Sequence, residues 1–245
     1  MQLQEAVFRG GRATPPFWTL RFETERPPAA GRFVLADLGG AVREVLFPSA
    51  VDEGAFESVV APGHPATRLL PGTPVSLLGP GGRGFRVAGA ARLLLVAEAE
   101  QLSPLCPLLQ AAPAVAVVVE APGRALLPPP GRFPPSVELH LVTHDGSVGH
   151  AGRLEALLEA GPLEPLLAWA ERLCCACAPA RYPALARSVR RVRLQPGGDF
   201  AQALVRTPLP CGVGACEICR ITTRNGERQV CTTGPVFDLL ELDER

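Results

Sequence analysis

The sequence contains no lysine: all 24 of its basic residues are arginines, and 24 acidic residues balance them to a formal net charge of zero. We attribute the missing lysine to genome composition rather than to function. The absence of a basic excess argues against nucleic-acid binding, which normally requires a basic patch or stripe. No run of apolar residues is long enough to span a membrane, and the first residues, MQLQEAVFRG, lack the apolar core of a signal peptide. We therefore expect a cytoplasmic protein.

Three segments of the 245-residue chain differ in pattern, and they predict three domains. Residues 1–90 contain short apolar runs separated by proline and glycine, which is typical of a small antiparallel β-barrel. Residues 91–198 alternate apolar runs with segments of helical pattern, which favours an α/β domain with a parallel sheet. Residues 199–245 are dense in glycine and cysteine, and a segment this small needs a metal centre to help it fold.

The α/β segment contains three continuous apolar runs, which have the composition of strands that are buried on both faces. They span residues 92–97, 115–120 and 137–143. Between the first two runs, residues 102–112 are long enough for one helix, although their prolines make it irregular. An arginine-rich run at 187–193 is typical of a solvated face, and its alternative interpretation is a docking site for a partner.

Four of the eight cysteines have the spacing C-x4-C-x2-C-x11-C: Cys211, Cys216, Cys219 and Cys231. Four thiolates are the ligands of a [2Fe–2S] cluster, and the x4–x2 spacing is that of plant-type ferredoxins. Gly212 and Gly214 allow the loop to curl tightly, so that backbone N–H groups approach the sulfides. Residues 223–226, Thr-Arg-Asn-Gly, contain the hairpin signal Asn-Gly. A hairpin there would return the chain so that Cys231 reaches the cluster.

Two other interpretations of these four cysteines stay open. A structural zinc site normally pairs two short Cys-Cys knuckles, whereas here three cysteines share one loop and the fourth stands apart. The thiols could also be unligated. The separate group Cys174, Cys175 and Cys177 is more typical of buried, inert cysteines than of a second metal site. The four histidines show no ligand spacing and are interpreted as structural or surface residues.

Several motifs together resemble one known family. They are CGVGACEIC at 211–219, VCTTGPVF at 230–237, GPGGRGF at 79–85, VTHDGSVGHAG at 142–152 and CAP at 177–179. With them the chain resembles, over nearly its whole length, the iron–sulfur flavoprotein electron-transfer subunits of heteromeric dihydroorotate dehydrogenases, within the ferredoxin–NADP reductase superfamily. The resemblance implies a barrel that binds FAD, an α/β domain that binds a nicotinamide, and a cluster-bearing tail.

The resemblance also implies a function in pyrimidine biosynthesis. Electrons would pass from NADH through FAD and the [2Fe–2S] cluster to the FMN of a separate catalytic dihydroorotate dehydrogenase subunit, within a heterotetramer. No catalytic residue is expected in this chain itself. Two rival functions stay open: an independent flavin and iron–sulfur reductase with another acceptor, and a non-catalytic assembly subunit that keeps the cluster alone.

The FAD contacts implied by the resemblance are Ser49, Ala66, Thr67 and Arg68. Ser49 ends a segment that matches the family's R-P-x-S motif, although Leu46 stands where the motif has arginine. Ala66-Thr67 corresponds to the family's Gly-Thr pair for the FAD pyrophosphate, with Arg68 beside it to neutralise phosphate.

The nucleotide-binding turn departs further from the family. Where a glycine-rich turn normally approaches the pyrophosphate, residues 97–101 read Ala-Glu-Ala-Glu-Gln. We expect the two glutamates, Glu98 and Glu100, to repel a dinucleotide. Efficient use of NAD(H) is therefore not expected.

Overall fold

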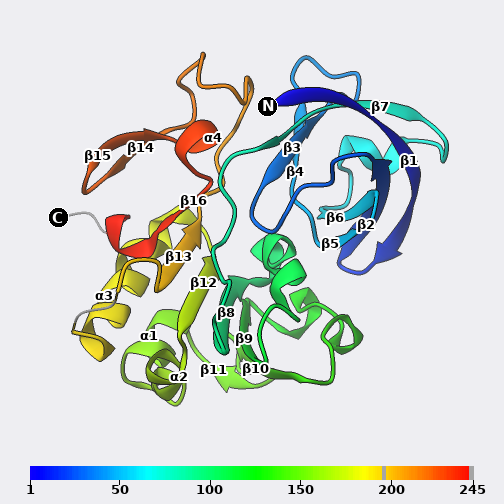
Figure 1. Cartoon of the computed structure of the whole chain (residues 1–245). Coiled ribbons are helices and arrows are strands. Elements are labelled where there is room, and N and C mark those ends of the chain that lie inside the picture. The colour runs from blue at the N-terminus through cyan, green and yellow to red at the C-terminus, as the bar shows by residue number, and fades with distance from the viewer. Residues whose placement is uncertain (195–196, 243–245) are drawn as a thin grey trace.

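The structure is a computed structural model that describes residues 1–194 and 197–242 of the chain. Figure 1 shows three parts: a curled antiparallel sheet at the N-terminus, an α/β sheet below it, and a tail in orange and red that lies against both. This order of parts is the one that the sequence predicts, and the fold class is confirmed. No helix in the described ranges is long and apolar enough to span a bilayer.

The N-terminal sheet contains seven antiparallel strands in the order β4-β3-β7-β1-β2-β6-β5. Their bounds are β1 Gln2–Thr14, β2 Phe17–Thr24, β3 Phe33–Ala36, β4 Glu44–Leu46, β5 Ala50–Asp52, β6 Ala55–Val60 and β7 Pro74–Gly81. The sheet curls around a core in which Phe22 contacts Phe8 and Phe56, with ring centroids 5.4 and 5.3 Å apart. These aromatic pairs connect neighbouring strands β1, β2 and β6 within the core of the curled sheet.

The second sheet has the order β11-β10-β9-β8-β12-β13-β16, and all of its pairs are parallel except the last. Its strands are β8 Arg92–Glu98, β9 Ala114–Ala121, β10 Val137–Thr143, β11 His150–Ala151, β12 Arg172–Ala176, β13 Ala201–Leu204 and β16 Val236–Asp238. One face is covered by helices α1 Leu154–Ala160, α2 Glu164–Trp169 and α3 Tyr182–Val192. Leu94 and Val96 of β8 point to that face, whereas Leu93 and Leu95 point to the other, as the alternation of strand residues requires.

The opposite face is covered by short 3-10 helices instead of an α-helix. The helix expected at 102–112 is replaced by η2 Ala99–Gln101 and η3 Ser103–Leu108. Pro104 lies in the first turn of η3 and Pro107 lies inside it. A proline has no N–H to donate to an α-helical hydrogen bond. Further 3-10 helices are η1 Pro65–Arg68, η4 Arg124–Leu126, η5 Pro130–Arg132, η6 Pro179–Arg181 and η7 Leu239–Glu241.

The tail is joined to the α/β sheet by hydrogen bonds. Strand β13, which the sequence analysis assigns to the segment 199–245, pairs in parallel with β12, and β16 pairs with β13. The tail therefore contributes two strands to the neighbouring sheet. Between them lies the predicted hairpin, formed by β14 Arg220–Thr223 and β15 Gly226–Gln229, and a single turn of helix, α4 Val230–Thr233.

Candidate functional site

The four cysteine thiols predicted as cluster ligands come together in two pairs. The side chain of Cys211 contacts that of Cys216, and the side chain of Cys219 contacts that of Cys231. The hairpin returns the chain to the loop as the sequence predicts, because Val230 N–H donates to the carbonyl of Cys219 at 3.0 Å. Residues twenty apart in the sequence thus lie in one small region of the tail.

Two glycines of the loop cannot be replaced without displacing a neighbour. Gly212 and Gly214 have φ angles of +67° and +82°, in the left-handed region that favours glycine. A Cβ on Gly212 would lie 2.5 Å from Cδ1 of Leu35, and one on Gly214 would lie 2.7 Å from Oε1 of Gln229. Gln229 also donates from Nε2 to the carbonyl of Gly214 at 3.1 Å. The loop is therefore packed closely on both sides.

Backbone N–H groups of this loop point at sulfur. Burial raises the pKa of the Cys211 thiol, but N–H donors from the residues that follow it, with the Cys216 side chain, lower that pKa to about 6. Burial and the adjacent Cys219 thiol raise the pKa of Cys231 to about 12, although an N–H donor from Gly214 offsets part of this increase. Donors aimed at sulfur stabilise the thiolate, which is the form that binds metal.

The arrangement fits a dinuclear cluster better than a single ion. Within residues 1–194 and 197–242, no three Cys, His, Asp or Glu side chains converge on one metal-ion position. A structural zinc ion requires four ligands around a single point. Two pairs of thiols beside a loop lined by N–H groups suit a [2Fe–2S] cluster, whose four external positions are filled by four thiolates. The assignment of the four cysteines as ligands stays a prediction.

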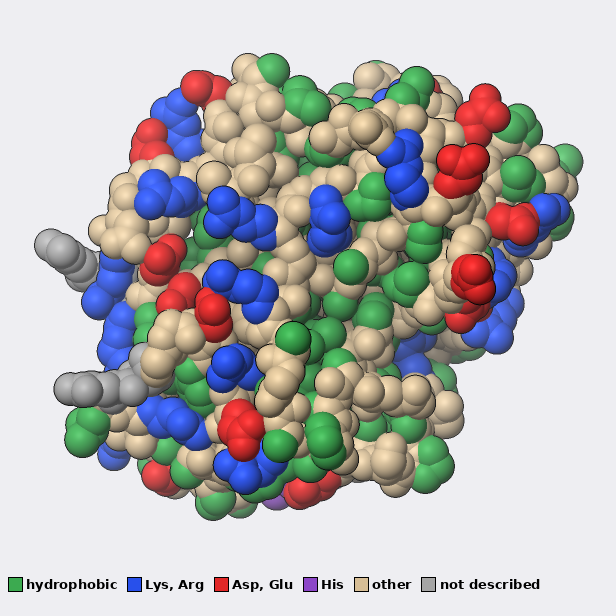
Figure 2. All heavy atoms as spheres, viewed as in Figure 1, with side chains coloured by type: hydrophobic (Ala, Val, Ile, Leu, Met, Phe, Trp, Pro, Cys, Tyr) green, Lys and Arg blue, Asp and Glu red, His purple; other side chains and the backbone are tan. Residues whose placement is uncertain are grey.

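One end of the cysteine group reaches the surface. The side chains of Cys219 and Cys231 are only 1% and 2% exposed, whereas Cys216 is exposed. Val213 and Ile218, which flank Cys216 in the loop, are 54% and 62% exposed. Figure 2 shows apolar side chains over this loop, which Figure 1 draws in orange. Two exposed apolar side chains thus lie near the most accessible thiol, together with the exposed ion pair of Glu217 and Arg220.

A cavity of about 590 Å³ lies between the barrel and the α/β domain. The barrel supplies mostly apolar walls, including Phe17, Val45 and Phe47, and the α/β side supplies Gln101 and Arg206. Ligand pockets commonly have volumes of roughly 300–1,000 Å³, mostly apolar walls and a few polar groups. The cavity therefore has the size and character of a site for a small organic cofactor.

One wall residue of the cavity and two of the four cysteines belong to the same buried apolar cluster. Phe47, which lines the cavity, belongs to the same cluster as Leu35, Cys219 and Cys231. The length of the connecting segment also limits the distance between the cavity wall and the cysteine loop. Arg206 precedes Cys211 by five residues, which span roughly 18 Å at most when fully extended. The cavity wall at Arg206 and the first cysteine of the loop are therefore at most about 18 Å apart.

None of the four predicted FAD contacts lines this cavity. Ser49 is buried and lines a separate hollow of about 420 Å³. Thr67 donates from its hydroxyl to the carbonyl of His64 at 2.7 Å, and the N–H of Ala66 donates to Nδ1 of His64 at 3.3 Å. Arg68 is exposed. His64 lines the cavity, so these residues lie beside it, and their contact with FAD stays a prediction.

The polar residues that line the cavity are Ser58, His64, Glu100, Gln101 and Arg206. Glu100 and Gln101 belong to the turn that the sequence marks as the nucleotide-binding turn, whereas Ser58, His64 and Arg206 are not singled out by the sequence as site residues. Phe47 lies in the recognisable Leu-Phe-Pro-Ser segment, and it could have been found from that motif. Arg206 lies in no recognisable motif and reaches the barrel only through the tertiary fold.

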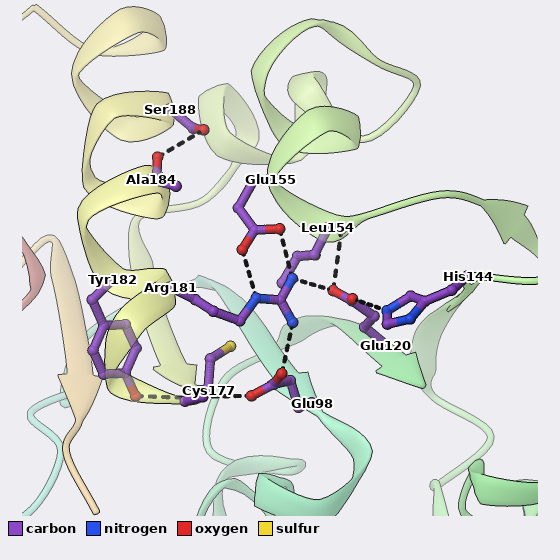
Figure 3. Close-up of polar contacts among 11 residues, drawn as sticks. Glu98, Glu120, His144, Leu154, Glu155, Cys177, Arg181, Tyr182, Ala184 and Ser188 are labelled. Carbon is purple, nitrogen blue, oxygen red and sulfur yellow. Dashed lines mark hydrogen bonds and ion pairs between the residues drawn. The ribbon is translucent and has the colours of Figure 1, made fainter. Parts of the chain in front are cut away.

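A partly buried ion-pair network lies where strands β8 and β9 end, and Figure 3 shows its contacts. Arg181 donates from Nη1 to Glu98 at 2.8 Å and from Nη2 to Glu120 at 2.5 Å. It also holds Glu155 through Nε and Nη2, at 2.5 and 2.6 Å. Glu120 contacts His144 as well. Three carboxylates therefore enclose one guanidinium.

This network changes the interpretation of the nucleotide-binding turn. The turn forms η2 and contains no glycine, as its sequence requires. Glu98 does not face outward to repel a ligand, however, because it accepts from Arg181 and from the N–H of Ala178 at 2.5 Å. Only a hollow of about 210 Å³ remains beside the network, with Glu98, Glu100 and Glu120 among its walls. In α/β sheets, nucleotides bind at this carboxyl edge of the strands.

Comparison with known proteins decides the nature of the tail. The sequence profile of the iron–sulfur cluster binding domain of dihydroorotate dehydrogenase B matches residues 208–243. The tail belongs to this domain family. The dihydroorotate dehydrogenase B-type tail contains all four cysteines, from Cys211 to Cys231, and the resemblance noted from the sequence is thereby confirmed.

Two curated relatives carry the same family name. Both are electron transfer subunits of dihydroorotate dehydrogenase B (NAD(+)). The one from Clostridium acetobutylicum is 28% identical over 100 residues, and the one from Clostridium perfringens is 27% identical over 106 residues. The matches cover 41% and 43% of this chain but only 36% and 38% of the relatives.

Solved structures share the fold of the whole chain. A structure of an NADH-dependent reduced ferredoxin–NADP oxidoreductase has a TM-score of 0.75, with 19% identity, over 98% of this chain and 90% of that chain. The ferredoxin reductase in carbazole 1,9a-dioxygenase has a TM-score of 0.64, with 18% identity, over 82% and 68% of the two chains. The chain therefore has the ferredoxin-reductase fold ahead of its dihydroorotate dehydrogenase B-type tail.

Proposed function

We propose that the chain is an electron-transfer subunit that passes electrons through FAD and a [2Fe–2S] cluster to a dihydroorotate dehydrogenase catalytic subunit. One observation carries the proposal: the four thiols gather in two pairs beside N–H donors, and one pair, Cys219 and Cys231, shares a buried apolar cluster with Phe47 in the wall of a cofactor-sized cavity. The family of the tail and the names of its relatives support the same function.

The residues of the chain have distinct tasks in this function. Cys211, Cys216, Cys219 and Cys231 would ligate the cluster, and the loop N–H groups would hydrogen-bond its sulfur atoms and so tune its potential. A flavin, when bound, supplies the conversion between electron pairs and single electrons. Phe47 and Leu35 belong to the same buried apolar cluster as Cys219 and Cys231. No residue of this chain needs to transfer a proton to a substrate.

The exposed end of the cysteine group is the surface proposed for the catalytic partner. Val213 and Ile218 expose apolar surface near Cys216, and burial of such surface favours association. Basic and acidic side chains are intermixed on the rest of the face shown in Figure 2. A heterotetramer in the cytoplasm, with two copies of each subunit, is the assembly that we propose.

Electrons are proposed to enter from a donor other than NADH. The carboxyl edge of β8 and β9 is filled by Arg181 and its three carboxylates, and no α-helix N-terminus follows β8 within the described residues. A dinucleotide pyrophosphate normally takes its N–H donors from such a terminus. The same crowding favours a second candidate function, in which the chain is an assembly subunit that carries the cluster without transferring electrons from a nucleotide.

Anaerobic purification and analysis of iron, sulfide and flavin test the proposal. We expect about two irons per chain and an EPR signal after reduction, as for a cluster with four thiolates. The C211A variant should lose the iron, whereas C106A, which removes a buried cysteine far from the loop, should keep it. Zinc in place of iron would refute the cluster assignment. Cluster without flavin would favour the assembly subunit, and turnover with an unrelated acceptor would favour an independent reductase.

A further inference from the structure

Arg206 lies in the segment that leads from β13 to the cysteine loop, and its guanidinium faces the barrel across the cavity. Its Cζ is 5.0 Å from the centroid of the Phe47 ring. Nη1 donates to Oε1 of Gln101 at 3.1 Å and to the carbonyl of Glu100 at 3.5 Å. These neutral contacts orient the guanidinium toward the cavity without neutralising its charge.

No carboxylate compensates this charge. Among the residues that the structure describes, no ion pair joins the Arg206 guanidinium to an Asp or Glu, and Glu100, which also lines the cavity, accepts from it only through its backbone carbonyl. Burial lowers the pKa of Arg206, an effect that Tyr182 partly offsets. Arg181 shows the opposite arrangement, with three carboxylates around it. A half-buried cation without a counter-ion is costly, and such groups normally pair with an anion.

Arg206 is also the only arginine among the described residues that line the cavity. His64 lines it too, but burial lowers the pKa of this histidine, with a smaller opposing effect of Glu44, so that it is neutral at pH 7. The barrel motif offers no substitute, because Leu46 stands in the arginine position and is buried in the barrel core. An anion in this cavity would therefore find its arginine partner in Arg206.

We propose that Arg206 binds a phosphate of the flavin and replaces the arginine that the barrel motif lacks. This inference rests on the proposed function, in which the cavity holds FAD. The oxidised flavin ring is neutral, so only the phosphates bring a full negative charge to the resting protein. The guanidinium matches phosphate geometry with its fork of N–H donors. Phe17, Val45 and Phe47 leave apolar walls for the ring.

Flavins that differ by one phosphate test the inference. Full-length protein, stripped of flavin but with its cluster intact, is dialysed to equilibrium against FAD, FMN or riboflavin. The wild type should prefer FMN to riboflavin by roughly tenfold or more, since a charge-assisted hydrogen bond is worth that factor. In R206Q, FMN and FAD should bind roughly 10- to 100-fold more weakly, whereas riboflavin should be affected less than about threefold. R206K should recover part of the loss because it keeps the charge.

Matched variants and outcomes separate this inference from the proposed function. R9Q removes an exposed arginine of β1, outside the cavity, and should bind all three flavins as the wild type does. Equal binding of FMN by R206Q and wild type would overturn the role of Arg206, as would an equal loss for riboflavin. A wild type that binds no flavin would refute the proposed function itself. If circular dichroism shows that R206Q is unfolded, two other measurements test the role of Arg206. They are the preference of the wild type for FMN over riboflavin and the binding of FMN by R206K.

Discussion

Arg181 holds Glu155 by two hydrogen bonds, from Nε to Oε1 at 2.5 Å and from Nη2 to Oε2 at 2.6 Å. The two residues come from η6 and α1, and the same guanidinium also binds carboxylates at the ends of β8 and β9. One side chain therefore joins the helical layer to the sheet, at the edge where a nucleotide binds in other proteins of similar architecture.

Removal of the guanidinium should destabilise the fold. Glu120 is only 1% exposed, and without Arg181 it becomes a buried and poorly compensated charge. We expect R181Q to lower the free energy of unfolding by about 3 kcal/mol, as for other broken buried pairs. Urea denaturation of R181Q and wild type measures this difference in the free energy of unfolding. The control is R191Q, which removes an exposed pair with Glu159 and should cost less than about 1 kcal/mol. Equal losses in the two variants would contradict the importance of the network.

Stability should fall in acid through Glu155. Burial raises the pKa of this carboxyl, but hydrogen bonds from Arg181 lower it, and the net pKa is below its ordinary value of 4.5. A lowered folded-state pKa stabilises the protein above the unfolded pKa, and that contribution is lost as pH falls through the folded value. Denaturation curves from about pH 6 down to pH 3 should show this loss in the wild type. E155Q should show less of it, whereas E159Q should retain the wild-type slope.

The cysteine loop should not tolerate a side chain at Gly212. Its φ is +67° and a Cβ there would lie 2.5 Å from Leu35. We expect G212A to reduce the iron content per chain, because the loop must move to accommodate the methyl group. G131A is the matched control, since a Cβ at Gly131 meets nothing within 4 Å. Full iron occupancy in G212A would show that the loop geometry is not needed for the cluster.

NADH should reduce the protein slowly or not at all. The glycine-free turn at η2 and the network around Arg181 leave no N–H cradle for a pyrophosphate at the end of β8. Stopped-flow absorbance after mixing with NADH measures the rate, and dithionite gives the fully reduced reference. Rapid bleaching of flavin or cluster at micromolar NADH would contradict the prediction.

A charge on the apolar rim of Cys216 should weaken docking of the catalytic subunit. Ile218 is 62% exposed beside this thiol. We expect I218D to weaken the complex by roughly tenfold or more, because a carboxylate must be desolvated in an apolar contact. L70D places the same charge on a barrel loop, at a residue that is 75% exposed, and should bind normally. Surface plasmon resonance with the purified catalytic subunit distinguishes the two variants.

The sequence by itself determines the features that depend on local spacing. The order of barrel, α/β sheet and tail follows from where apolar runs, prolines and glycines fall along the chain. The cysteine group is equally local, because its loop and hairpin lie within residues 211–231 and their spacing already predicts that the thiols meet. The 3-10 character of η3 also has a local cause in Pro104 and Pro107, although only the structure shows that no α-helix survives there.

Only the tertiary structure decides which charges meet. Arg181 lies 83 residues from Glu98 and 61 from Glu120, so no spacing rule links them. From the sequence alone, Glu98 is expected to repel a nucleotide, and only the structure shows that it is paired with Arg181. Arg206 lies far from Phe47 in the sequence and belongs to no motif, yet it faces the barrel across the cavity. A local pattern records propensity and spacing, whereas the pairing of distant charges depends on how the sheets and the tail pack. For this reason the cluster segment can be read from the sequence, but the polar groups of the cavity and of the nucleotide edge cannot.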